Sequence, residues 1–74
     1  MYSDFKTNLM LAIMSYMIIN VYMVNDEKIV IGSGGLSKDL IGFKSFGFYI
    51  RGQNSYKWYS YSSIIKIEVY GHEF

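Results

Sequence analysis

The sequence predicts an α+β fold: an N-terminal helix followed by about five short antiparallel strands that form a strongly bent sheet or a small open barrel. Apolar residues recur at helical spacing near the start of the chain. The runs that follow are rich in β-branched and aromatic residues, and short turn sequences separate them. With 74 residues and no evident linker or repeat, we expect a single small domain over residues 1–74.

The helix is predicted over residues 3–14. Ser3 is a suitable N-cap, and Asp4 would place a negative charge in the first turn, where the helix dipole favours it. Side chains that recur three or four positions apart are expected to share one face and to point toward the core. These side chains are Phe5, Leu9, Ala12, Ile13 and Tyr16.

A β-hairpin is predicted directly after the helix. Residues 16–24, YMIINVYMV, are rich in β-branched and aromatic side chains, and residues 28–32, KIVIG, continue this composition. Asn25 and Asp26 lie between the two runs and supply turn chemistry. Both faces of the first run are apolar, so we expect both to be buried, either within one subunit or at an interface.

Three further strands are predicted at residues 46–51, 56–61 and 64–70, because turn residues separate these runs. The segment 36–45 gives no clear boundaries. Alternation within the first and third of these runs predicts side chains that point inward. These are Phe46, Phe48, Ile50, Ile65, Ile67 and Val69.

The composition bounds how the protein assembles. Apolar residues make up 51% of the chain and aromatic residues 19%, which is more than one small core can hide. No cysteine is present, so no disulfide can add stability. We therefore expect a homo-oligomer.

The longest apolar stretch does not predict a membrane segment. Residues 9–24 are shorter than the roughly 20 residues needed to span a bilayer, and Ser15 and Asn20 interrupt them. The preceding charges, Asp4 and Lys6, cancel, and no small-residue cleavage site follows. We expect a cytoplasmic protein without a membrane partner.

Groups suited to catalysis are scarce. A hydrolase or transferase needs a nucleophile and a base that activates it. The only histidine, His72, lies close to the end of the sequence. Asp26 and Glu27, a pair of adjacent carboxylates, lie at the predicted hairpin tip. We expect no enzymatic activity, no cofactor and no metal.

A glycine-rich loop follows the predicted hairpin at residues 32–35. It is not a nucleotide-binding P-loop, because its lysine follows a serine rather than a glycine. Two interpretations remain: a flexible connection, or a loop whose N–H groups bind an anion such as a nucleotide and which a ligand or a neighbouring subunit orders. On the second interpretation, the ligand-binding residues are Ser33, Gly34, Gly35, Ser37 and Lys38.

Aromatic residues on faces that should be exposed are the strongest functional signal. Tyrosine, methionine and arginine are enriched at the centres of protein interfaces. Tyrosine and tryptophan also stack on nucleic-acid bases. The candidate interface or stacking residues are Tyr16, Tyr22, Met23, Tyr49, Arg51, Trp58, Tyr59, Tyr61 and Tyr70.

Residues 50–52 form an Ile-Arg-Gly tripeptide. This tripeptide, after a helix and among about five strands, is similar to Sm-like RNA-binding proteins, in which such a tripeptide lies in the last inter-strand loop and contacts a base. Two strands' worth of sequence follow Gly52 here, where that family has one, so no site is transferred from it. Arg51 as an edge charge and Gly52 as a turn residue remain the simpler interpretation.

Two functions are expected from these features. The first is a non-enzymatic, homo-oligomeric interaction protein that binds a host protein or encloses a small anionic ligand. Its small size, its lack of catalytic groups and its abundance of isoleucine, lysine and tyrosine, a bias expected from an A+T-rich coding sequence, suit a phage-encoded inhibitor of a bacterial defence system. The alternative is a single-stranded RNA- or DNA-binding protein in which the aromatic residues stack on bases and Arg51, Lys57 and Lys66 contact phosphates. A net charge of +1 favours the first.

Overall fold

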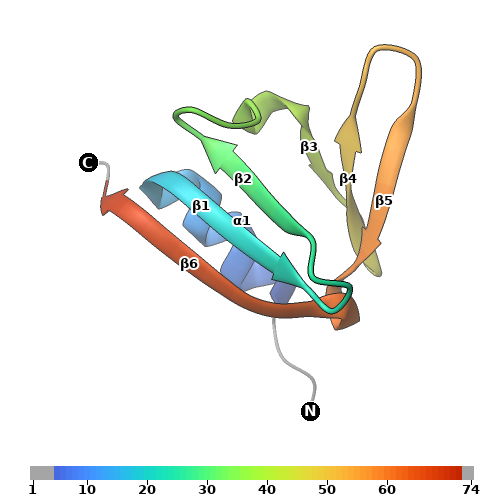
Figure 1. Cartoon of the computed structure of the whole chain (residues 1–74), viewed down its shortest axis with the longest axis horizontal. Helices are drawn as coiled ribbons and strands as arrows, with labels where there is room; N and C mark the ends of the chain where they lie inside the picture. Colours follow the sequence, from blue (N-terminus) through green and yellow to red (C-terminus); the bar gives the residue numbers. More distant parts are fainter. Residues whose placement is uncertain (1–4, 73–74) are drawn as a thin grey trace.

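The predicted order of a helix followed by strands is confirmed. The computed structural model describes residues 5–72, and Figure 1 shows the helix, in blue, behind the first and the last strand. The elements are α1 (Phe5–Ser15), β1 (Tyr16–Met23), β2 (Lys28–Gly32), η1 (Lys38–Leu40), β3 (Ile41–Phe43), β4 (Gly47–Arg51), β5 (Tyr56–Ser60), η2 (Tyr61–Ser63) and β6 (Ile64–His72).

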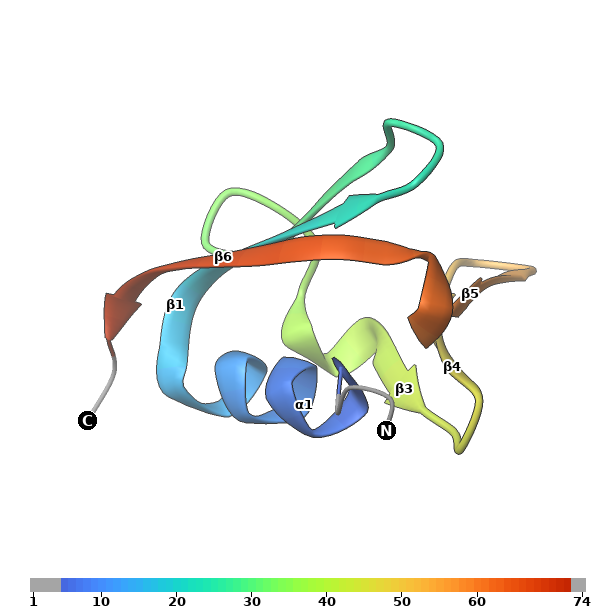
Figure 2. The ribbon, with the colours of Figure 1, turned by 90° about the horizontal axis from the view of Figure 1, so that it is seen from below.

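The strands form two antiparallel sheets of three strands each among the described residues. In the first sheet β1 lies between β2 and β6, and in the second sheet β4 lies between β3 and β5. Figure 2 shows α1 against one face of the first sheet, with no helix or strand on the opposite face. The α+β class is therefore confirmed. The sheets do not close on each other, so the barrel form of the prediction is not confirmed.

The core lies between α1, the inner face of the first sheet and the inner face of β4. The helical spacing predicted three of its residues correctly, since Leu9, Ala12 and Ile13 are buried. The predicted cap and first-turn acid, Ser3 and Asp4, lie outside the described residues. The other buried apolar side chains are Ile19, Val21, Met23, Ile29, Ile31, Phe48, Ile50 and Ile64.

The β1–β2 hairpin confirms the turn at Asn25 and Asp26. Asp26 has φ of +69°, a left-handed conformation that aspartate tolerates better than most residues. One expectation for this hairpin is wrong. Met23 was expected at an interface, but it is 3% exposed and belongs to the core of the single chain.

Two side chains predicted to point inward are exposed instead. Phe46 is 67% exposed because β4 begins at Gly47, so Phe46 belongs to the preceding turn and does not follow the alternation. Ile65 is 56% exposed because β6 contains a bulge: Tyr22 pairs with Lys66 and Met23 with Ile64, which leaves Ile65 as the additional residue.

Candidate functional site

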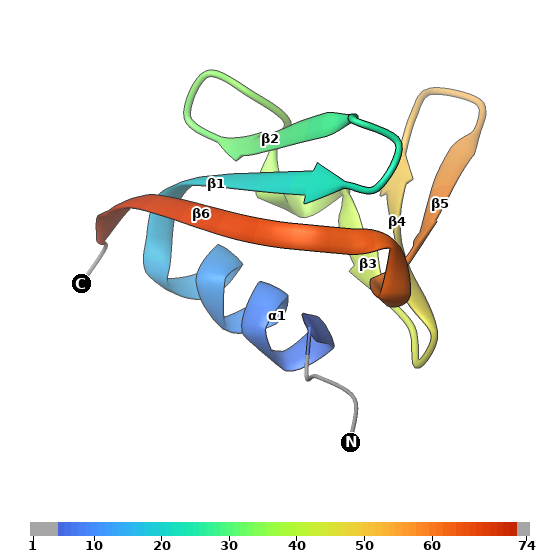
Figure 3. The same ribbon diagram turned by 60° about the horizontal axis from the view of Figure 1, so that its bottom comes forward.

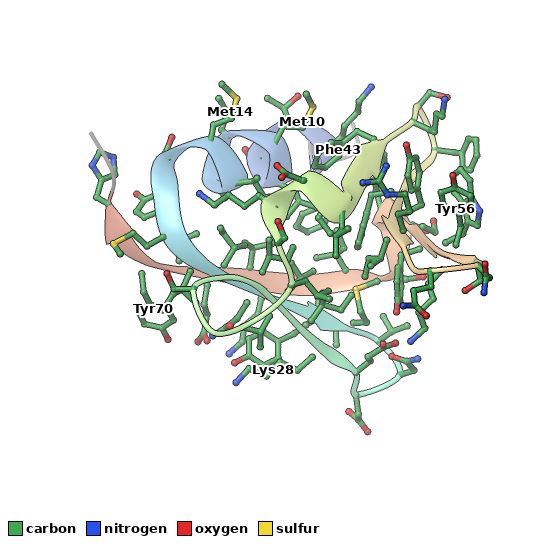
Figure 4. The ribbon with its side chains drawn as sticks, turned by 90° about the horizontal axis from the view of Figure 1, so that it is seen from above. Met10, Met14, Lys28, Phe43, Tyr56 and Tyr70 are labelled. Atoms are coloured by element: carbon green, nitrogen blue, oxygen red, sulfur yellow. The ribbon has the colours of Figure 1, made fainter. Side chains whose placement is uncertain are left out.

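Four aromatic side chains lie on the face of the second sheet that points away from the core. We call this group, Phe46, Tyr49, Tyr56 and Trp58, the aromatic surface. Phe46 is 67% exposed, Tyr56 57% and Trp58 51%, while Tyr49 is half-buried. Figure 3 shows β4 and β5 side by side at one end of the first sheet, and Figure 4 shows Tyr56 pointing outward there. A group of exposed rings this large marks a candidate binding site.

The register of β4 and β5 brings these rings together. Tyr49 pairs with Trp58, and paired residues leave a sheet on the same face. The ring centroids of these two residues are 4.9 Å apart. Phe46 stacks on Trp58 at 6.0 Å, and Tyr56 meets Tyr49 edge-on at 5.2 Å. The four rings therefore form one continuous row.

A glycine in β3 sets the position of the central ring. Gly42 pairs with Tyr49, and the tyrosine ring lies directly over the glycine backbone. A Cβ atom at Gly42 would lie 2.0 Å from Cζ of Tyr49, so any larger residue would displace the ring. Gly42 thus helps to set the geometry of the aromatic surface, although it has no ring of its own.

The charge around the aromatic surface is positive. Residues 40–63 include the second sheet and contain Lys44, Arg51 and Lys57 but no aspartate or glutamate. All three cations are exposed, but Lys57 alternates with Tyr56 and Trp58 onto the other face of β5, where its Nζ lies 3.9 Å from Oε2 of Glu27. The charge excess at the aromatic surface therefore comes from Lys44 and Arg51. Arg51 pairs in register with Tyr56 at one end of the row, and Lys44 lies two residues before Phe46. The overall net charge of +1 conceals this local excess.

The structure brings together three of the predicted interface or stacking residues: Tyr49, Arg51 and Trp58. Sequence reasoning missed Tyr56 and Phe46. Tyr56 could have been found, because it lies two positions before Trp58 and alternation places both on one face. Phe46 could not have been found in this way, because its exposure depends on where β4 begins.

Two other predicted residues, Tyr59 and Tyr61, pack against the core rather than on an exposed face. Tyr59 stacks on Phe48 with centroids 5.1 Å apart, and Tyr61 contacts the same ring at 6.2 Å. Their hydroxyl groups donate hydrogen bonds, Tyr59 to Oε2 of Glu27 at 2.7 Å and Tyr61 to the backbone oxygen of Lys44 at 2.6 Å. Both residues support the second sheet from within.

Burial, and after it the hydrogen bond to Glu27, raises the pKa of Tyr59 to about 12, from 10 for an ordinary tyrosine. The folded chain holds this proton more tightly than the unfolded chain, so the contribution to stability is complete below pH 10 and lost as the pH rises toward about 12. We expect the urea midpoint to fall across this window more steeply in the parent than in Tyr59→Phe. Parallel curves would contradict the assignment.

Of the three predicted tyrosines on the first sheet, Tyr16 packs against the core, whereas Tyr22 and Tyr70 lie on the uncovered face. Both hydroxyl groups donate to Oε1 of Glu68, at 2.8 Å and 3.3 Å. Nζ of Lys66 lies 3.5 Å from Oε2 of the same carboxylate. The hydrogen bond from Tyr22 is the main reason why the pKa of Glu68 is lowered. The polar groups of this face therefore form hydrogen bonds and an ion pair with one another.

The glycine-rich loop is held by its own chain. The N–H groups of Gly32, Ser33 and Gly35 donate to the backbone oxygens of Leu36, Met17 and Gly32, respectively. In this conformation these groups do not converge on an anion site. Ser37 caps η1, and Lys38 donates to the backbone oxygen of Tyr16, a half-buried residue that packs against the core.

The two central glycines of this loop should respond differently to alanine. Gly34 has φ of +81° and open space around it, so Gly34→Ala should lower the free energy of unfolding by about 1 kcal/mol. At Gly35 a Cβ atom would lie 2.4 Å from the backbone oxygen of Val30, so Gly35→Ala should cost more. Urea unfolding of both variants checks this order. A smaller loss at Gly35 would contradict the packing of the loop.

A shallow groove beside this loop is a weaker candidate site. It has a volume of about 520 Å³, and its lining includes Glu27 and Lys28 of the hairpin, Gly34 and Gly35 of the loop, and Lys57 of β5. Nζ of Lys57 lies 3.9 Å from Oε2 of Glu27. An anionic ligand would have to compete with this carboxylate for the lysine, so the groove is less suited to anions than its cations imply.

Within residues 5–72, no three metal-ligating side chains gather, and no helix is long and apolar enough to cross a membrane. Comparison with protein-family models, curated proteins and solved structures found no match. A functional proposal therefore depends on the surfaces of the chain itself.

Proposed function

We propose that this chain is a non-enzymatic binding protein that engages its partner through the aromatic surface. The observation that carries this proposal is the row of contacting rings, three of which are more than half exposed. Aromatic residues supply large contact area at low entropic cost, and they dominate the energetics of many binding sites. Arg51 and Lys44 flank the row and can add polar contacts at its ends.

Native mass spectrometry of the protein purified from cells tests this proposal. We expect the parent to carry a bound protein, nucleotide or nucleic acid as additional mass. The double variant Tyr56→Ala/Trp58→Ala should lose that mass, because it removes half of the row. A control variant, Val24→Ala/Ile65→Ala, alters side chains that are 61% and 56% exposed outside the surface and should retain it. A parent without bound mass, or equal loss in both variants, would contradict the proposal.

Self-association is a second proposed property, and a different surface favours it. Residues 7–25 contain no charged side chain, although they include the outer face of α1 beyond Lys6 in its first turn. Leu11 is 54% exposed, Met14 73% and Met17 45%. Figure 4 shows Met10 and Met14 pointing away from the sheets. An uncharged methionine-rich face can pack against a second copy with little loss of polar solvation.

Sedimentation velocity tests this property. We expect an oligomer for the parent and a shift toward monomer for Met14→Glu, because the change places a charge in the apolar contact. Ile65→Glu introduces the same charge at an exposed apolar position on another element and should not change the distribution. A monomeric parent at micromolar concentration would exclude self-association through α1.

A further inference from the structure

We infer that the ligand of the aromatic surface is single-stranded nucleic acid. This inference rests on the proposed function, because it assigns a chemical class to the partner of the same surface. It follows from the combination of three features at one place: exposed rings in a row, cations at both ends of the row, and a segment without carboxylates. The rings match the bases of a single strand, and the cations in a segment without carboxylates match its phosphates.

The rings suit unpaired bases. Every base has a flat π-face, so a row of exposed aromatic side chains binds successive bases with little dependence on sequence. Phe46 and Trp58 lie nearly parallel, with an angle of 24° between their planes, and Tyr56 stands at 88° to Tyr49. The row thus presents both ring faces and ring edges. A base pair in a duplex keeps its faces stacked inside the helix, so this mode of contact excludes duplex ligands.

The charges suit phosphates. Within the described chain, no carboxylate lies in ion-pair distance of Lys44 or Arg51. The described carboxylates belong to other elements: Asp26 and Glu27 to the first hairpin, Asp39 to η1 and Glu68 to β6. A protein partner would match the rings as well, but a polyanion also matches Lys44 and Arg51, the two cations beside the row. The local charge therefore favours nucleic acid over protein.

The aromatic surface is preorganised before a ligand binds. Tyr49 is held between Gly42 below it and the rings of Tyr56 and Trp58 beside it. Less side-chain freedom is then lost on binding, which raises affinity. This arrangement gives a test that keeps every ring: Gly42→Ala displaces the ring of Tyr49 without removing an aromatic residue.

Fluorescence anisotropy with labelled oligonucleotides tests the inference. The probes are a ten-nucleotide oligothymidylate, the matching oligouridylate and a duplex of the same length. We expect binding of one or both single strands and much weaker binding of the duplex. The two single-stranded probes decide between DNA and RNA as the source of the ligand.

Variants of the full chain locate the contact. Loss of one stacking ring should weaken binding about 5- to 150-fold, so Trp58→Ala and Tyr56→Ala are each expected to fall in this range. Gly42→Ala should also weaken binding, whereas Ile65→Ala should leave affinity unchanged. Circular dichroism of each variant confirms that it is folded before its affinity is interpreted.

The salt dependence measures the charge contribution. Two phosphate contacts, from Lys44 and Arg51, predict a slope of about −1.4 for log K against log salt concentration with single strands. Arg51→Gln should reduce the slope by about 0.7. The matched variant Lys28→Gln removes a cation from the first sheet and should leave the slope unchanged.

The two proposals fail in different ways. Equal or tighter binding of the duplex, or affinity that does not change in Trp58→Ala and Tyr56→Ala, would overturn the nucleic-acid inference. Absence of binding to all three probes would overturn it as well. If the parent then carries a protein that Tyr56→Ala/Trp58→Ala loses in native mass spectrometry, the proposed binding function stands with a protein partner.

Discussion

Phe48→Ala is expected to unfold most of the protein. Phe48 is fully buried, and the rings of Tyr59 and Tyr61 pack against it. Truncating a buried phenylalanine typically costs 3–5 kcal/mol, since a cavity remains where the ring was. A chain of 74 residues has a total stability of only about 4–11 kcal/mol. Circular dichroism and urea unfolding should therefore show loss of most or all of the folded population.

Phe46→Ala is the matched control for this change. It removes the same side chain two positions earlier, where the ring is 67% exposed and lies outside β4. We expect its free energy of unfolding to stay within about 0.5 kcal/mol of the parent. Comparable destabilisation by both variants would mean that the inward and outward assignments of these two rings are incorrect.

Met23→Arg is expected to have the second-largest effect. Met23 is 3% exposed and lies among the apolar side chains of the core, so the guanidinium would be buried without a counter-ion. Leaving a buried charge uncompensated costs about 3–5 kcal/mol. The variant should be largely unfolded in thermal denaturation followed by circular dichroism.

Tyr22→Arg, one position earlier, is the matched control for the unfolding expected of Met23→Arg. Tyr22 lies on the uncovered face of the first sheet, where its hydroxyl donates to Glu68. Arginine at that position can reach solvent, so we expect the chain to remain folded. An unfolded Tyr22→Arg beside a folded Met23→Arg would show that the faces of β1 are reversed.

Local pattern was sufficient to predict α1 and the first hairpin. The spacing of Leu9 and Ile13 marks a helix face, and Asn25 with Asp26 marks a turn between β-branched runs. It was not sufficient for β3, which is only Ile41–Phe43 and contains Gly42. A strand this short shows no alternation, and its pairing with β4 defines it. For the same reason, the bulge that turns Ile65 outward depends on the partner strand.

The candidate site shows the same division between local and non-local information. Tyr49, Arg51 and Trp58 were predicted as exposed interface or stacking residues, and alternation is enough to place them. Tyr59 was also predicted there, but it faces Phe48, because the inner face of β5 covers the core. The backbone contacts that hold Gly35 are equally invisible in the sequence. A clearer case is the hydrogen bond from the N–H of Ser33 to the backbone oxygen of Met17 in β1, which the loop meets only after the hairpin has formed.

The central position of β1 has a consequence for biosynthesis. One neighbour of β1 is the next strand, but the other is β6, so that Ile19 pairs with Val69 near the opposite end of the chain. During translation the uncharged segment 7–25 is synthesised before β6, its second partner. Its free strand edge and apolar side chains are then exposed to other nascent chains, which is the condition under which strands aggregate. Fast closure by β6, or a chaperone that covers β1 until then, is what this topology requires of the cell that makes it.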